Sequence, residues 1–296
     1  MNNPLPRLPD FEYIRLDAAE STVAFLEEHH GQAKPILGGT DLLVVLRDRK
    51  IQPNYLVEIK HLAGFDAYDF CPGQGLTLGA AVTLNQVIAS AAVQEHYPAL
   101  GQAARQVGGY QLRNRATLVG NLCNASPCGD TIGPSLLYQG TLEVLGTSGI
   151  RSIRLTDFFL GPGNTTLEPG EIVRAIHFPT PPEGCQGIYL AFGRNKLSDL
   201  ALAAVTVLAT PNPAAASGYR FQIALSAVSP TVILVKEARA LLSEQPISPA
   251  SFEKAARIAM DQCRPIDDIR SSKAYRRELI FTLTLRALNQ VWEALH

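Results

Sequence analysis

Apolar residues change their spacing along the chain, and the changes mark short alternating elements near its start. A helical spacing begins after Asp17 and ends near Gly31, a short apolar run ends at Leu37, and a second helical spacing follows Thr40. Asp17 and Thr40 are suitable N-caps for these two helices. A β-type run then occupies positions 55–59. Strand, helix and strand at these intervals predict a small α/β subdomain over about residues 1–62.

Residues 63–180 predict a second subdomain that mixes helices with strands. Thr83 is a suitable N-cap for a helix that continues to His96, and Pro98 suits the first turn of another helix. Gly146 and Gly149 flank a turn between two β-type runs, which is the pattern of a hairpin. The predicted elements are a strand at 76–79, helices at 83–96, from 98 onward and at 132–138, and hairpin strands at 141–145 and 150–155.

The sequence Pro-Thr-Pro-Pro-Glu-Gly at residues 179–184 is the best candidate linker in the chain. Beyond it, the pattern predicts three strands followed by three helices, at 187–192, 202–209, 221–227, 232–243, 251–263 and 272–295. The predicted class is therefore α+β, with one domain at residues 1–180 and a C-terminal domain at residues 185–296.

Two glycine-containing stretches have a composition that suits a bound anion. Residues 34–42 read Lys-Pro-Ile-Leu-Gly-Gly-Thr-Asp-Leu, and residues 120–130 read Gly-Asn-Leu-Cys-Asn-Ala-Ser-Pro-Cys-Gly-Asp. Glycine lets the backbone approach a ligand closely, and a glycine turn before a helix start collects free N–H groups where a pyrophosphate could bind. A tight turn with a capping threonine explains one such loop equally well. Two in one chain favour a bound cofactor.

The composition of the chain excludes several classes of protein function. The chain has 296 residues, enough for about two domains. A net charge of −1 argues against a protein that binds nucleic acid or an acidic membrane. The N-terminus has no charged segment followed by an apolar run, and the most apolar stretch, residues 200–209, is too short to span a bilayer. We therefore expect a cytoplasmic protein without a membrane span.

No residue pattern predicts a metal site or catalytic chemistry on this chain. The five cysteines lack disulfide-framework spacing, and the one close pair, Cys123 and Cys128, falls short of the four ligands of a zinc or iron–sulfur site. We expect free thiols. Gly161-x-Gly163 lacks the third glycine of a dinucleotide fingerprint, and neither a P-loop nor a His-Glu-x-x-His motif is present.

The two loops resemble those of the FAD-binding subunit of molybdenum hydroxylases, the xanthine dehydrogenase and aerobic carbon monoxide dehydrogenase family. That family has Gly-Gly-Thr-Asp in the first loop. Its second loop reads Arg-Asn-x-x-Thr-x-Gly-Gly-Asn, followed by Ala-Ser/Asp-Pro-x-x-Asp, and residues 113–121 and 125–130 match this pattern. The stretches 157–171, 192–199 and 265–276 are also similar to family segments. In the family the last of these faces partner subunits.

The resemblance implies a two-subdomain FAD-binding domain of the PCMH, or vanillyl-alcohol-oxidase-like, type. The diphosphate would lie between the two loops, Asp130 would accept a hydrogen bond from a cofactor hydroxyl, and two apolar side chains would form part of the wall near the flavin ring. The implied cofactor-binding residues are Pro35, Ile36, Leu37, Gly38, Gly39, Thr40, Asp41, Leu42, Thr117, Leu118, Val119, Gly120, Asn121, Asp130, Ile172 and Val173.

The resemblance also implies an electron-transfer role. Substrate would react on a large molybdopterin-binding partner, and FAD would take electrons from a small [2Fe-2S] subunit and pass them to an external acceptor. This agrees with the absence of an evident nucleophile, base or metal ligand here.

Two residues depart from the family pattern. Val119 stands at the first glycine of Gly-Gly-Asn, and Ala191 stands where members often carry a lysine beside the flavin. If position 119 had positive φ, valine would store strain; we expect negative φ there. The two departures motivate an alternative, a scaffold subunit that has lost flavin. A stand-alone flavin oxidoreductase is disfavoured, because neither loop offers a histidine for covalent flavin.

Overall fold

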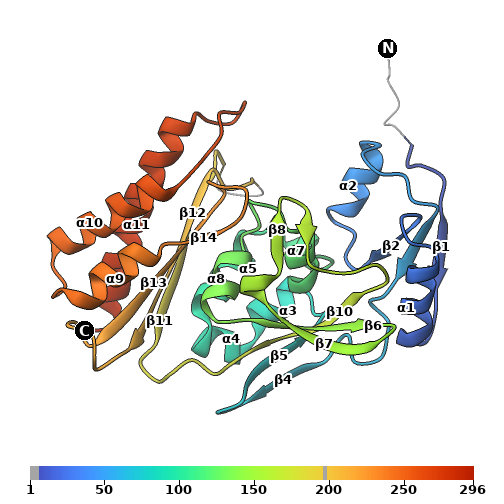
Figure 1. Cartoon of the computed structure of the whole chain (residues 1–296), viewed down its shortest axis with the longest axis horizontal. Coiled ribbons are helices and arrows are strands. Elements are labelled where there is room, and N and C mark those ends of the chain that lie inside the picture. The colour runs from blue at the N-terminus through green and yellow to red at the C-terminus, as the bar shows by residue number, and fades with distance from the viewer. Residues whose placement is uncertain (1–6, 196–198) are drawn as a thin grey trace.

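The computed structural model describes residues 7–195 and 199–296. Figure 1 shows an elongated molecule in which the N-terminal, middle and C-terminal parts follow one another along the long axis. Helices and strands are mixed in each part, so the predicted α+β class is confirmed.

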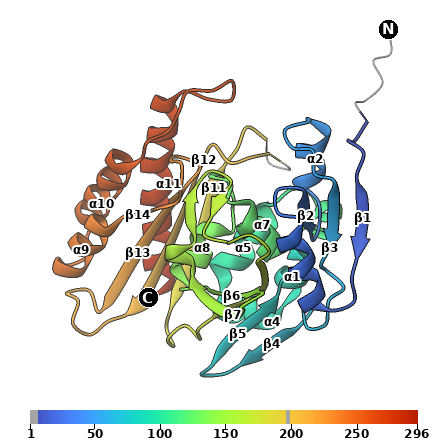
Figure 2. The ribbon, with the colours of Figure 1, turned by 45° about the vertical axis from the view of Figure 1, so that its right-hand side comes forward.

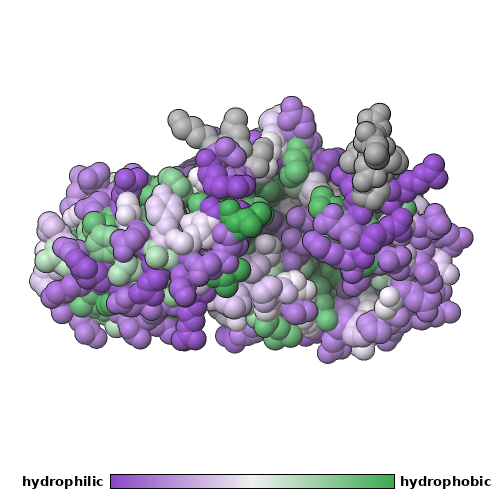
Figure 3. Space-filling view, turned by 90° about the horizontal axis from the view of Figure 1, so that it is seen from above, coloured by the Kyte–Doolittle hydropathy of each residue, from purple (hydrophilic) through white to green (hydrophobic). Residues whose placement is uncertain are grey.

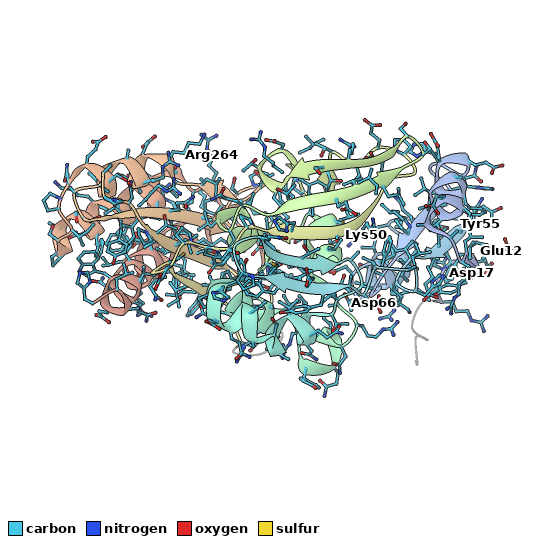
Figure 4. The ribbon with its side chains drawn as sticks, turned by 90° about the horizontal axis from the view of Figure 1, so that it is seen from below. Glu12, Asp17, Lys50, Tyr55, Asp66 and Arg264 are labelled. Carbon is cyan, nitrogen blue, oxygen red and sulfur yellow. The ribbon has the colours of Figure 1, made fainter. Side chains whose placement is uncertain are left out.

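The N-terminal part is a parallel three-stranded sheet with a helix on one face. Its elements are β1 (Glu12–Arg15), α1 (Ala19–Glu28), β2 (Ala33–Ile36), α2 (Leu42–Arg47) and β3 (Tyr55–Glu58), with the strands in the order β1-β3-β2. Val23 and Leu26 of α1 are buried in the same hydrophobic core as Val57 of β3. Figure 4 shows the paired residues Glu12 and Tyr55 at the end of the molecule far from Arg264.

Both predicted N-caps in this part are wrong. Ala18 precedes α1, and Asp41 precedes α2, in each case without a side-chain cap hydrogen bond. Before α2 the backbone N–H of Leu43 already donates to the carbonyl of Gly39, at 2.9 Å. The helical turn therefore starts at Gly39, and Thr40 lies inside it instead of capping it.

The middle part contains an antiparallel five-stranded sheet in the order β4-β5-β10-β6-β7. Several helices accompany it, and a two-stranded ribbon formed by β8 and β9 follows β7. The elements are β4 (Tyr68–Cys71), β5 (Gly75–Gly79), α3 (Leu84–Ala89), α4 (Ala91–His96), α5 (Pro98–Gln106), α6 (Tyr110–Arg113), α7 (Leu118–Asn124), α8 (Ile132–Leu137), β6 (Thr141–Gly146), β7 (Gly149–Arg154), η1 (Leu155–Asp157), β8 (Phe159–Gly161), β9 (Asn164–Thr165) and β10 (Ile172–Phe178).

The predicted helix at 83–96 is two helices. Thr83 caps the first in a capping box with Gln86, as the sequence predicts for this residue. The helical pattern then breaks at Ser90, which has extended backbone angles and accepts a hydrogen bond from the N–H of Val93 at 3.1 Å. A serine that caps a new helix ends the preceding one at the same residue.

The C-terminal part is an antiparallel sheet covered on one face by helices. Its elements are β11 (Gln186–Phe192), β12 (Ala203–Pro211), β13 (Tyr219–Ser226), β14 (Ile233–Leu234), α9 (Lys236–Glu244), α10 (Pro249–Gln262) and α11 (Lys273–Ala294). The three predicted strands are confirmed. The short fourth strand, β14, displaces the start of the next helix from the predicted residue 232 to Lys236.

The alternating residues of β11 belong to two different cores. Ile188 and Leu190 pack with the core beneath α9–α11, whereas Tyr189 and Ala191 pack with the core of the middle part. The C-terminal sheet is therefore a layer between its own helices and the middle part, as Figure 2 shows. This arrangement brings Tyr189 and Ala191 to the side on which the glycine segments lie.

Candidate functional site

The two glycine segments meet in the structure. A Cβ atom on Gly38 would lie 2.7 Å from the carbonyl carbon of Arg115 and 3.1 Å from the Cα of Ala116. No side chain fits at that separation. The backbone of the first loop therefore contacts the backbone just before α7, although the two are far apart in sequence.

The first loop is a turn with accessible backbone. Gly39 has φ of +72°, a conformation that residues with a Cβ rarely adopt. Ile36 belongs to β2 and Leu42 is the first residue of α2, and the residues from Ile36 to Thr40 are partly exposed. Seen from above, the surface is hollowed where the N-terminal part meets the middle part (Figure 3).

The second segment is helical, where the sequence suggests a loop. Thr117 is the N-cap of α7, and its Oγ1 accepts a hydrogen bond from the N–H of Gly120 at 2.9 Å. Leu118 and Val119 are each 1% exposed and belong to the core of the middle part. Gly120 and Asn121 remain partly exposed on the other side of the same turn.

Helix α7 determines the backbone conformation of Val119. Val119 has helical geometry and is not among the described residues with positive φ. Its side chain fills the core, so a β-branched residue at this position stores no backbone strain. The alternative of a strained loop is wrong.

Two threonine caps lie side by side at the second segment. Thr83 and Thr117 form an isolated antiparallel bridge, and the N–H of Leu84 donates to the carbonyl of Ala116 at 2.8 Å. Helices α3 and α7 therefore begin next to each other, beside the contact with Gly38.

Arg113 and Asn114 of the motif stabilise the segment that leads to this point. The Nη1 of Arg113 donates to the carbonyls of Arg105, Val107 and Gly108 at 3.0, 3.1 and 2.8 Å. Asn85 donates to Asn114 Oδ1 at 2.7 Å. These side chains are used within the protein, which gives them a structural role.

Asp130 connects the site to the C-terminal sheet. It is 8% exposed, and its Oδ1 accepts a hydrogen bond from the Tyr189 hydroxyl at 2.5 Å. Burial raises the pKa of Asp130 to about 6, and burial together with the nearby carboxyl raises the pKa of Tyr189 well above its usual value. On the same segment Thr131 donates to Asn121 Oδ1 at 2.7 Å. A chain of contacts thus links α7 to β11.

Ile172 and Val173 do not form an exposed wall. They are 2% and 3% exposed on β10, and both belong to the core of the middle part. The expectation that their side chains line a cofactor surface is therefore not met by this conformation, because both are covered by their own core.

Sequence reasoning missed the pair Tyr13 and Glu58 on the N-terminal sheet. The Tyr13 hydroxyl donates to Glu58 Oε2 at 2.6 Å, and Glu58 is 6% exposed. The missed signal is a carboxylate inside the apolar run at 55–59, because a buried carboxylate requires partners. Strand β1, which carries Tyr13, is a short edge strand with mostly exposed residues, so its pattern is weak.

Within the part of the chain that the structure describes, no group of three or more histidine, cysteine or acidic side chains is arranged to hold a metal ion. All five cysteines are free, and burial raises the pKa of Cys123 to about 12. No helix over residues 7–195 and 199–296 is long and apolar enough to cross a membrane.

Comparison with known proteins decides the family. The profile of the FAD binding domain in molybdopterin dehydrogenase matches residues 9–181, and that of the CO dehydrogenase flavoprotein C-terminal domain matches residues 189–291. The chain belongs to this flavoprotein family. The matched domain binds FAD, so the predicted cofactor is confirmed. The chain is an FAD subunit of the kind found in xanthine and CO dehydrogenases.

Relatives of this flavoprotein match over most of their length. It is 30% identical over 263 residues to the xanthine dehydrogenase FAD-binding subunit of Escherichia coli O157:H7, covering 88% of each chain. It is 29% identical to the carbon monoxide dehydrogenase medium chain of Hydrogenophaga pseudoflava, covering 96% of this chain and 98% of that one.

Solved structures agree with the fold of the flavoprotein. A chain of the Hydrogenophaga pseudoflava carbon monoxide dehydrogenase superposes with a TM-score of 0.91 at 29% identity, over 97% of this chain and 99% of that one. A chain of quinoline 2-oxidoreductase from Pseudomonas putida 86 gives 0.90 at 25% identity, over 98% and 99%.

Proposed function

We propose that this flavoprotein is the electron-transfer subunit of a molybdenum hydroxylase. It takes electrons from a [2Fe-2S] partner subunit and passes them to an external acceptor, while the substrate reacts on a large molybdopterin-binding subunit. The observation that carries the proposal is the contact of Gly38 with the backbone of Arg115 and Ala116, which joins the two cofactor loops. Bound FAD would supply the exchange of one or two electrons.

The residues around that contact fit a diphosphate. Gly39 adopts a conformation that suits glycine, Gly38 admits no side chain, and the backbone of both segments is partly exposed. We assign the diphosphate to Pro35, Ile36, Leu37, Gly38, Gly39, Thr40, Asp41, Leu42, Thr117, Leu118, Val119, Gly120 and Asn121. In this assignment Leu118 and Val119 act by holding the helix start in place, because their side chains are buried.

Asp130, Ile172 and Val173 have narrower roles in the proposal than the resemblance implies. Asp130 Oδ1 is engaged by Tyr189, which leaves Oδ2 for a cofactor hydroxyl. Ile172 and Val173 would meet the cofactor through their backbone, since their side chains are covered. The flavin ring would then lie toward β11, on the face that carries Tyr189 and Ala191.

An exposed apolar surface on the C-terminal part supports the partner proposal. Ile269 is fully exposed and Ile266 is 70% exposed on the loop before α11. Asp268 holds this loop through Arg270 and through Arg276, whose Nη2 lies 2.9 Å from Asp268 Oδ1. Apolar side chains presented on a fixed loop favour docking against another subunit. Two further exposed residues, Phe192 at the end of β11 and Tyr275 in the first turn of α11, stack edge to face.

We also propose that residues 1–180 form the FAD-binding domain, with subdomains at about 1–62 and 63–180, and that residues 185–296 form the C-terminal domain. The protein would work in the cytoplasm as part of its complex.

Two other functions remain as alternatives. The hypothesis of a scaffold subunit without flavin rested on Val119 and Ala191. Val119 is unstrained and no longer supports it, so its only remaining support is that alanine stands at position 191 in place of a lysine. A stand-alone oxidoreductase has no feature in the described structure that favours it.

The test is the purified chain, alone and with its partners. We expect absorption bands at about 450 nm from bound oxidised flavin, and no turnover of an organic substrate by the chain alone. A folded chain with no flavin after incubation with FAD would support the scaffold. Steady turnover by the isolated chain would support the stand-alone enzyme. The proposed function predicts instead co-purification with a molybdopterin subunit and an iron–sulfur subunit.

A further inference from the structure

The carboxyl ends of the parallel strands meet at one edge of the N-terminal sheet. Arg15 ends β1, Glu58 ends β3 and Ile36 ends β2, and the three residues are in register. The turn at Gly38 and Gly39 leaves from this same edge. Ligands of open α/β sheets bind beyond the carboxyl ends of the strands, so this edge is a place to look for part of the ligand site.

Tyr13 presents a fixed aromatic ring near this edge. Its hydroxyl is anchored by Glu58 at 2.6 Å, yet the residue is 52% exposed. Glu58 is itself held by Lys60, with Nζ 3.4 Å from Oε1, and His61 Nδ1 lies 3.7 Å from the same oxygen. The anchored hydroxyl restricts the ring while much of the residue stays open to solvent.

Arg115 lies at the glycine turn that leaves this edge. Its backbone carbonyl lies against Gly38, and its side chain is exposed. Burial and the hydrogen bond to Glu58 raise the pKa of Tyr13 to about 12, so Tyr13 stays protonated over the neutral range.

The position of the N-terminal sheet along the molecule indicates which half of a bound dinucleotide would lie next to Tyr13. Figure 1 shows β1 at the N-terminal end of the molecule and β11 on the other side of the middle part. The flavin ring is proposed to lie toward β11. A cofactor whose diphosphate lies at Gly38 would then direct its other end toward the N-terminal sheet, which carries Tyr13.

We propose that Tyr13 and Arg115 form the base-binding end of the cofactor site, where the adenine ring of FAD stacks on the Tyr13 ring. This inference rests on the proposed function, because it takes the diphosphate to lie at the Gly38 turn. An aromatic ring accepts a planar base on its face, and a guanidinium can stack on the base or neutralise the adjoining phosphate.

The test separates the two halves of the cofactor. Apo protein is titrated with FAD by flavin fluorescence, and ADP and FMN are each used as competitors. For Tyr13→Ala we expect FAD and ADP affinities to fall about tenfold or more, in line with the effect of removing one base–aromatic stack. FMN affinity stays within about twofold of wild type, because FMN has no adenine.

Three further variants sharpen the result. Tyr13→Phe keeps the ring and is expected to bind FAD within about threefold of wild type. Arg115→Ala should weaken ADP more than FMN. Tyr68→Ala is the matched control, because Tyr68 is 44% exposed and also holds a side-chain partner, Ser90, but lies on β4. It should leave all three affinities unchanged.

Other outcomes overturn the inference in distinguishable ways. Equal losses of ADP and FMN in Tyr13→Ala would give Tyr13 a structural role only, and unchanged ADP affinity in both Tyr13→Ala and Arg115→Ala would place the base elsewhere. A wild-type chain that binds neither FAD, ADP nor FMN would reject the proposed function itself, and this inference with it.

Discussion

Gly38 lies directly against the carbonyl group of Arg115, a residue 77 positions later in the sequence, and a Cβ at Gly38 would come within 2.7 Å of the Arg115 carbonyl carbon. This contact fixes the distance between the first glycine turn and the start of α7. Both segments must stay in place for a diphosphate to reach the backbone of each.

Gly38→Ala is therefore expected to separate the two segments. The Cβ meets backbone atoms, which cannot rotate away as a flexible side chain can, so the loop must shift. We expect FAD affinity to fall at least tenfold, equivalent to about 1.4 kcal/mol, with the circular dichroism spectrum largely retained. Fluorescence titration with FAD measures this, and unchanged affinity would remove the contact from the site.

Gly39→Val tests the turn itself. At φ of +72° a β-branched residue costs on the order of 1–3 kcal/mol, or moves the turn to avoid that cost. We expect loss of FAD from the purified protein. Gly31→Val is the matched control, because Gly31 has φ of +79° and no atom within 4 Å of an added Cβ. The control should lose comparable stability and keep its FAD.

Val119→Gly should destabilise the protein without tightening FAD binding. The substitution removes a side chain that is 1% exposed and places glycine inside α7. Lost burial and the poor helix propensity of glycine together predict a decrease of roughly 2–4 kcal/mol in the unfolding free energy. Urea unfolding measures the decrease. A gain in FAD affinity would contradict the helical geometry at this position.

Asp130 should make stability depend on pH in a defined window. Its folded pKa of about 6 lies above the ordinary value of 3.8, so between these pH values the native state binds more protons than the unfolded state. Stability from this group is thus lost as pH rises from about 4 to 6, by roughly 3 kcal/mol in total.

The comparison with Asp130→Asn isolates this effect. Relative to the variant, the wild type should become progressively less stable between pH 4 and pH 7, as followed by urea unfolding at each pH. A constant difference between the two proteins over that range would mean that Asp130 titrates normally.

The loop before α11 should be needed for assembly and not for folding. Ile269→Asp places a charge on a fully exposed residue, so thermal stability and FAD content should stay close to wild type. Co-purification with partner subunits should be lost if the loop docks against them. Ile150→Asp, at a residue 56% exposed on β7, is the control and should assemble normally. Equal assembly of both variants would place the interface elsewhere.

The sequence by itself determined the features that depend on neighbouring residues. Thr83 and Pro98 begin helices as predicted, because capping and the fixed φ of proline act within one turn. The hairpin across Gly146 and Gly149 and the three long strands of the C-terminal sheet also follow from local periodicity. The two glycine segments were found in the same way, since their composition is unusual wherever it occurs.

Only the tertiary structure decided how these elements are used. Residues 118–124 form a helix because Leu118 and Val119 enter a shared core, and the pattern of the segment alone does not reveal that core. The short edge strand β1 exists through pairing with β3, in which Glu12 lies opposite Tyr55.

The site depends on the same kind of distant contact. Asp130 meets Tyr189, Tyr13 meets Glu58, and Gly38 meets Arg115, each across 45 or more residues. The periodicity of the sequence indicates whether a side chain is buried, but it does not indicate which residue that side chain packs against. Those partners are set by the packing of sheets and helices in three dimensions, and that packing decides which residues can share one cofactor.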